Sequence, residues 1–306
     1  MTTQLRRDGT YMQSRMYSSL AVIVPLFAIV GPLGCGLSVQ QQAAVDRFSA
    51  ATSDFATVSR SEFQQSRADV IEMNRRRSQL GDDSVPVTAL DGLFTVDRTA
   101  ARLAAIDALQ EYAQLLGSLV STTPPSEVKA AADSFVASLR RVPGVSLSDT
   151  DASTIGRAVV FVGTLFIEYK RKKAIQEVVE IAHPHILATV DLVKQDFDPD
   201  SDLWSAGYRQ VTLDLRGAAQ AARVHVPAGD LPAQALIAGA AALAQENAAR
   251  FGAVGGEVIH TADRLREAQQ NLRYAVYSNE ISSQDIDNYV NQVNELMTIY
   301  SLLRTR

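Results

Sequence analysis

Two Glu-x-x-His pairs are the residues whose types and spacing come nearest to a reaction centre. Glu180 precedes His183 by three residues, and Glu257 precedes His260 by the same interval. In a helix this spacing places a carboxylate and an imidazole on one face. Two such pairs, together with a glutamate from each of two further helices, form the ligand set of di-metal sites in helical bundles. A di-metal bundle enzyme is therefore one function that the pattern allows.

The surroundings of the two pairs favour solvated helix faces over a metal centre. The segment 201–225, which lies between the pairs, has no glutamate that could complete the ligand set. Glu257 and His260 share a helical face with charged residues, away from the apolar positions of the same segment. Those charged residues are Arg250, Arg264 and Glu267, and the apolar positions are Val254, Val258 and Leu265. We therefore predict a protein with no catalytic residues, metal or cofactor, and not an enzyme.

The single cysteine, Cys35, stands where an apolar run ends and a glutamine-rich polar segment begins. The run, residues 20–33, follows three arginines, Arg6, Arg7 and Arg15. It is too short to cross a membrane as a helix, which takes about 20 apolar residues. A positive region followed by a short apolar region is typical of an export signal.

The four residues Pro32-Leu33-Gly34-Cys35 resemble the lipobox of bacterial lipoproteins. The resemblance covers residues 1–35 and implies that a signal peptide, 1–34, is removed and that Cys35 becomes the acylated N-terminus. Gly36 after the cysteine, in place of aspartate, implies sorting to the outer membrane, with the chain facing the periplasm. The implied partner is thus a membrane, bound through a lipid anchor in the bacterial cell envelope. Two alternatives stay open, an uncleaved anchor and an ordinary signal peptide with an incidental cysteine.

Composition and charge favour a helical protein without a nucleic-acid partner. Of the 306 residues 46% are hydrophobic, glycine (17) and proline (10) are sparse, and the net charge is −5. Much of the hydrophobic fraction is alanine, which favours helices over strands. A basic excess that would indicate nucleic-acid binding is absent from the sequence.

Apolar residues recur every three or four positions between the prolines, which predicts a series of long helices. The expected helices cover 38–80, 95–121, 125–141, 151–196, 201–225, 232–277 and a last segment from 282. Several are roughly 45 residues long, or about 65–70 Å. Short breaks between long helices favour antiparallel neighbours. We therefore expect residues 35–306 to form one domain, an elongated antiparallel bundle of about six or seven helices.

The most apolar stretch of the expected domain is 155–167, which four basic residues follow. One reading is a segment that inserts into membranes, as in a membrane-active helical protein. The stretch is too short to span a bilayer as one helix. We therefore favour a helix that is buried in the centre of the bundle.

The linker 81–93 is the best candidate for a contact with a partner. Val85, Val87, Leu90 and Leu93 are apolar in an otherwise polar loop. This loop is expected at the far end of the first helix, away from Cys35. The alternative is that the four side chains only cover the end of the bundle. We expect a non-enzymatic structural or protein-interaction role, in which the partner is another envelope protein.

Overall fold

The computed structural model describes residues 36–82, 84, 86–121, 123–163, 168–201, 203–278 and 283–304. The chain divides by its internal contacts into two units, Met1–Leu33 and Gly34–Arg306. The described residues all belong to the second unit, so the expected signal segment 1–34 and Cys35 lie outside them. All regular structure in the described part of the chain is helical, which confirms the all-α fold.

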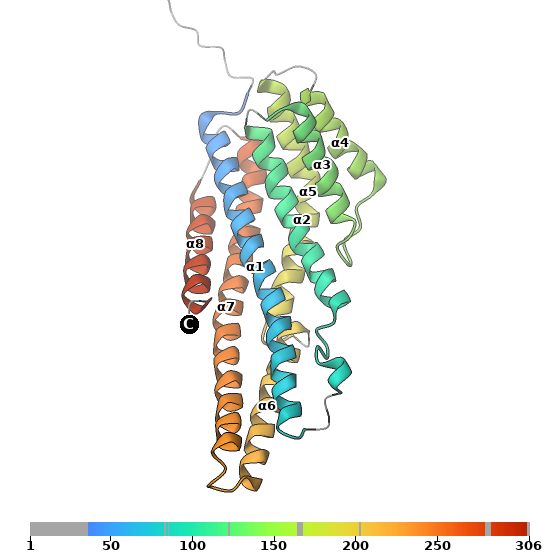
Figure 1. Ribbon diagram of the computed structural model, residues 1–306. Helices are drawn as coiled ribbons and strands as arrows, with labels where there is room; N and C mark the ends of the chain where they lie inside the picture. Colours follow the sequence, from blue (N-terminus) through green and yellow to red (C-terminus); the bar gives the residue numbers. More distant parts are fainter. Residues whose placement is uncertain are drawn as a thin grey trace, which may run out of the picture. The chain divides into compact units, whose positions relative to one another are not determined.

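An elongated helical bundle makes up the second unit. The helices of its described residues are α1 Val39–Gln79, the 3-10 helix η1 Val87–Ala89, α2 Val96–Val120, α3 Pro125–Leu139, α4 Asp149–Gly163, α5 Glu168–Phe197, α6 Trp204–His225, α7 Leu231–Tyr277 and α8 Gln284–Arg304. The two longest, α1 and α7, have 41 and 47 residues, which corresponds to about 60 and 70 Å. They pack against each other, and α6 and α8 contact both of them, as Figure 1 shows.

The start of α1 is tied to the end of α7, which sets these helices antiparallel. Ser38 caps α1 by accepting a hydrogen bond from the Gln41 backbone N–H, and the Gln41 side chain accepts one from the Ser38 N–H. The Gln41 side-chain amide then donates to the carbonyl oxygens of Ala275 and Ser278, at 2.7 and 2.9 Å. The last carbonyl groups of a helix generally lack intrahelical partners, so this contact joins and stabilises both helix ends.

The expected helix 151–196 is wrong, because this part of the chain forms two helices that pack against each other. α4 ends at Gly163 and α5 begins at Glu168. α4 packs against both α3 and α5, at the outer edge of the bundle in Figure 1. A single straight helix would have carried the apolar residues of α4 past the end of the bundle into water. The observed arrangement instead buries Ile155, Ala158 and Val159.

The described part of the apolar stretch 155–167 therefore contributes to the core. The side chains of 161–167 lie outside the described residues. Among the helices of the described residues, none combines the length and the hydropathy needed to cross a bilayer.

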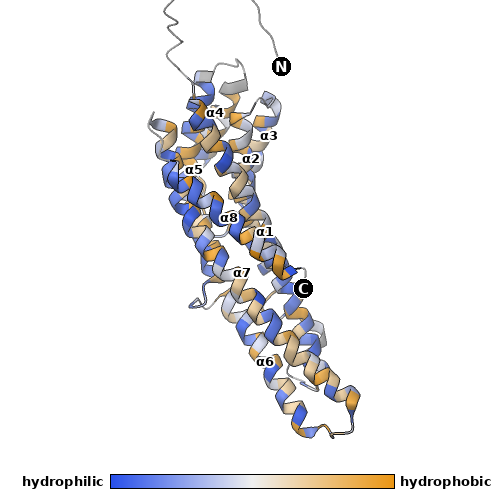
Figure 2. Cartoon of the chain, turned by 90° about the vertical axis from the view of Figure 1, so that its left-hand side faces the viewer, coloured by the Kyte–Doolittle hydropathy of each residue, from blue (hydrophilic) through white to orange (hydrophobic). Residues whose placement is uncertain are grey.

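The α6–α7 tip, residues 221–235, forms one end of the bundle, opposite the start of α1 (Figure 1). The linker 81–93 follows the end of α1, and α6 and α7 extend beyond it (Figure 1). Figure 2 shows hydrophobic residues at the α6–α7 tip, where Val224 and Leu231 are exposed. Two helices form this tip without further neighbours, so their outer faces remain open.

The core contains one buried polar pair between α2 and α7. The Tyr112 hydroxyl and the side-chain amide of Gln269 are both fully buried and hydrogen-bond to each other, with the Gln269 nitrogen 3.0 Å from the hydroxyl oxygen. Buried polar groups destabilise a fold when they lack a partner. This pair therefore requires that both residues be present together.

We expect Tyr112→Phe alone to lower the free energy of unfolding by about 1–3 kcal/mol, because it leaves the buried amide of Gln269 without its partner. The double variant Tyr112→Phe/Gln269→Leu removes both polar groups and should recover most of that loss. Urea unfolding monitored by circular dichroism measures both values. Equal destabilisation of the single and double variants would contradict the interpretation.

Candidate functional site

The structure keeps the two Glu-x-x-His pairs apart. Glu180 of α5 accepts two hydrogen bonds from Arg273 of α7, at 2.6 and 2.5 Å. Glu257 of α7 instead accepts from the Gln292 side chain of α8, at 2.9 Å. Positions 257 and 273 of α7 are separated by about 24 Å along the helix axis. Within the described ranges no three residues of the types His, Cys, Asp and Glu come close enough to hold a metal ion.

The histidines of the two pairs also differ in their surroundings. His260 is exposed on α7. His183 is half-buried on α5, and its Nδ1 atom has no hydrogen-bond partner among the described residues. Burial lowers the pKa of His183, and the nearby Arg273 lowers it further. The neutral imidazole is therefore favoured at position 183.

The linker 81–93 is fastened to the last turns of α1 by polar contacts. Arg77 donates to Asp82 and Ser84, at 3.0 and 3.1 Å. Asn74 donates to the carbonyl oxygen of Leu90 at 2.7 Å. Arg67 reaches the end of the linker, donating to the Phe94 carbonyl oxygen at 2.9 Å. These bonds fix a loop that has little regular structure of its own.

The four apolar residues of the linker have different surroundings. Val85 and the side chain of Val87 lie outside the described residues. Leu90 is half-buried, whereas 59% of Leu93 is exposed. Leu93 is therefore the residue of the predicted contact loop that the structure shows open to solvent.

A buried charge cluster joins α1, α6 and α7 in the middle of the bundle. It consists of Glu62 and Asp69 of α1, Tyr208 of α6 and Arg250 of α7. Arg250 donates to both carboxylates at 2.5 Å, and the Tyr208 hydroxyl donates to Asp69 at 2.8 Å. Glu62 has no exposed surface. One guanidinium group thus faces two carboxylates, and only one of the two negative charges is balanced.

The excess of negative charge in this cluster, together with burial, changes the pKa of Glu62. Burial raises the pKa of Glu62 to about 7, although the charge of Arg250 opposes this effect. Asp69 raises it further, because a second negative charge lies nearby. The cluster can therefore take up or release a proton near neutral pH.

This cluster was not predicted from the sequence, although the sequence carries a signal for it. Phe48, Phe55, Glu62 and Asp69 follow each other at intervals of seven along α1. In a helix this spacing keeps them on one face. Two acids that continue an aromatic stripe indicate buried carboxylates that need a cationic partner.

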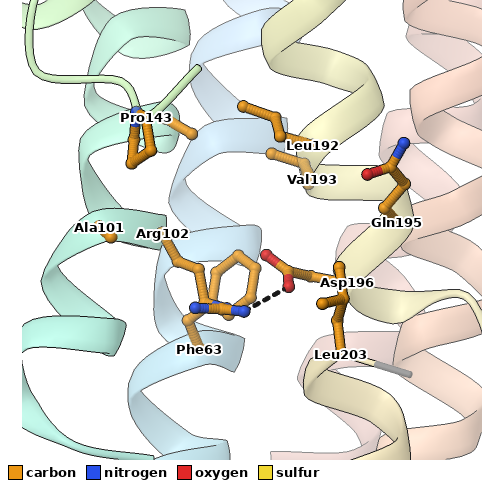
Figure 3. Close-up of a pocket in the computed structure, with 10 residues that line it drawn as sticks. Phe63, Ala101, Arg102, Pro143, Leu192, Val193, Gln195, Asp196 and Leu203 are labelled. Atoms are coloured by element: carbon orange, nitrogen blue, oxygen red, sulfur yellow. Dashed lines mark hydrogen bonds and ion pairs between the residues drawn. The ribbon is translucent and has the colours of Figure 1, made fainter. Parts of the chain in front are cut away.

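A second group of unusual contacts surrounds Arg102 of α2, as Figure 3 shows. Its guanidinium group donates to Asp196 of α5 at 2.7 Å and to the Arg98 carbonyl oxygen at 3.0 Å. The same group lies 4.5 Å from the ring centre of Trp204, a cation–π distance. Burial raises the pKa of Asp196, and the charge of Arg102 opposes that effect. Arg102 therefore links α2, α5 and α6.

Two hollows adjoin this contact, and both are lined by Arg102 and Leu203. We call them together the Arg102 groove. The first has a volume of about 180 Å³, and its other apolar lining includes Phe63, Pro143, Leu192 and Val193. The second has about 360 Å³ and includes Leu93, Phe94, Arg98, Trp204 and Gly207. The exposed residue of the predicted contact loop thus forms part of a hollow that sequence reasoning did not find.

Glu62 should make stability depend on pH. Its folded-state pKa, about 7, lies above the ordinary value of 4.5. Between these pH values the folded chain therefore binds more protons than the unfolded chain, and the free energy of unfolding falls as pH rises. Across this pH interval the free energy of unfolding of the wild type should fall by on the order of 2 kcal/mol more than that of Glu62→Gln.

Urea titrations between pH 4.5 and 7.5 measure this effect. Glu295→Gln, which changes an exposed glutamate of α8, is the matched control and should keep the wild-type slope. The assignment is wrong if Glu62→Gln and the wild type show parallel profiles.

Comparisons of the chain with known proteins do not indicate what these sites bind. No protein family matches the chain, and no curated protein sequence or solved structure is significantly similar to it. The geometry of the described side chains is therefore the basis for a functional assignment.

Proposed function

We propose that this chain is a lipid-anchored protein of the bacterial cell envelope, without enzymatic activity, that binds another envelope protein. The observation that carries the proposal is that the bundle includes residues directly after Cys35, since Leu37 already belongs to its hydrophobic core. The boundary between the two units of the chain falls after Leu33, two residues before Cys35. If Cys35 is lipidated, residues 1–34 are removed. The cleavage would then fall one residue after this boundary.

The described residues next to Cys35 support the same interpretation. Leu37 is the first described residue of the hydrophobic core, and the Ser38 cap starts α1. Three residues, 36–38, would then separate the acylated cysteine from a helix that is about 60 Å long. Such a helix would carry the rest of the bundle away from the lipid.

The exposed apolar residues near the second hollow support a protein contact on that part of the bundle. Leu93 and Leu203 line this hollow and are 59% and 49% exposed. Val96, at the start of α2, is also exposed. Apolar side chains that gather on a surface are typical of protein-binding sites.

We expect Cys35→Ser to release the protein from the membrane fraction of its host, because acylation at Cys35 supplies the attachment. Cell fractionation with immunoblotting measures the distribution, and incorporation of labelled palmitate into the wild type provides an independent readout. If the variant stays in the membrane fraction and the wild type takes up no label, the lipoprotein proposal fails.

We expect a photo-crosslinking amino acid at position 93 to capture a partner protein in intact cells. The matched control is position 274, because Tyr274 is exposed on α7 next to the start of α1. Immunoprecipitation followed by mass spectrometry should find an adduct that is specific to position 93. Identical adducts from both positions would show non-specific capture and argue against this contact.

A further inference from the structure

Two hydrogen-bond donors at the Arg102 groove have no acceptor among the described residues. They are the indole N–H of Trp204 and the Nε–H of Arg102. Trp204 is 3% exposed, so neither the solvent nor the protein fully satisfies its donor. Buried donors without partners are rare in folded proteins and cost stability. Their side chains are adjacent, since the guanidinium group stacks on the indole ring.

The charge at the groove favours an anionic acceptor. Arg98 lines the second hollow, is exposed, and forms no ion pair with any described residue. Asp196 is the acidic residue in the lining of the first hollow, and Arg102 already holds it at 2.7 Å. A ligand that brings a carboxylate to the second hollow would meet the charges of Arg98 and Arg102 beside the indole ring of Trp204.

The apolar lining of the first hollow indicates that the ligand also carries an apolar group. Its volume of about 180 Å³ and its lining by Phe63, Leu192 and Val193 suit one apolar side chain. Arg102 and Leu203 belong to both hollows. The carboxylate and the apolar group of a ligand would therefore lie within a few ångströms of each other.

We propose that the Arg102 groove binds the C-terminal residue of a partner protein, an apolar residue with a free α-carboxylate. The carboxylate accepts from Arg98 and Arg102 in the second hollow, beside the indole ring of Trp204, and the apolar side chain occupies the first. A C-terminal residue carries both groups on one Cα atom, whereas an internal aspartate or glutamate places its carboxylate on a different residue from its apolar neighbour. This assignment deepens the proposed interaction role and rests on it.

The test uses the mature protein and an acetylated tripeptide, acetyl-Gly-Gly-Leu, as the probe. Trp204 is the only tryptophan of the chain, so its fluorescence reports on the groove directly. We expect a saturable change in emission on titration. The C-terminal amide of the same peptide should bind about tenfold more weakly, because it lacks the charge that strengthens the hydrogen bonds.

Variants separate the two parts of the groove. Leu203→Ser should weaken binding of the acid about tenfold, since an apolar contact is lost. Leu213→Ser, which changes another exposed leucine of α6 (58% exposed), is the matched control and should bind as the wild type does. Arg98→Gln should weaken binding of the acid but leave that of the amide unchanged. Melting temperatures of the three variants verify that they fold.

Three outcomes would overturn the assignment. These are the absence of a saturable change up to about 10 mM peptide, equal affinity for acid and amide, and tighter binding of octanoate, which would assign the groove to a fatty acid instead. The test needs neither a membrane nor an acylated cysteine. Peptide binding with no anchoring at Cys35 would therefore reject only the envelope proposal, and crosslinking from position 93 with no peptide binding would reject only the C-terminal ligand.

Discussion

The contact of Arg250 with Glu62 and Asp69 constrains the centre of the bundle more than any single apolar contact. It joins α7 to α1, and through Tyr208 it includes α6. A guanidinium group and two carboxylates cannot be buried unless each finds its partners, because an isolated charge in the interior is strongly destabilising. These helices must therefore meet in one register. Apolar side chains alone would tolerate small shifts along the helix axes, whereas hydrogen bonds of this length do not.

Two of these three helices, α1 and α6, also contribute to the Arg102 groove, through Phe63 and Trp204. Tyr208 stacks on Phe251, and Phe94 and Phe63 pack against Trp204. Trp204 begins α6 only four residues before Tyr208, so the register set by the charge cluster also positions the indole ring. Gly207 makes the approach possible, because a Cβ atom there would lie 3.3 Å from the Phe94 ring. The groove is thus closely packed on its aromatic side, while Leu93 and Leu203 are open to solvent.

Much of the fold could be predicted from the sequence, and the candidate sites much less. The helices 38–80, 95–121 and 232–277 agree closely with α1, α2 and α7, since each ends at a glycine, a proline or a cap that acts over a few residues. The segment 151–196 was misassigned because its apolar period continues through the break between α4 and α5. The apolar residues of the linker 81–93 stood out in the sequence, but only the folded chain shows which of them is exposed.

The sequence by itself determined the helical class and most helix boundaries, because periodicity and caps depend on residues within one or two turns. The tertiary structure alone decided which side chains meet. Arg250 and Glu62 are 188 positions apart, and Arg102 and Asp196 are 94 apart, so no local pattern pairs them. It also decided that the two Glu-x-x-His pairs face different helices, since the rotation and register of packed helices place each carboxylate beside its own neighbour. The local sequence decides which side chains a helix face carries. The packing of the helices decides which other side chains they contact.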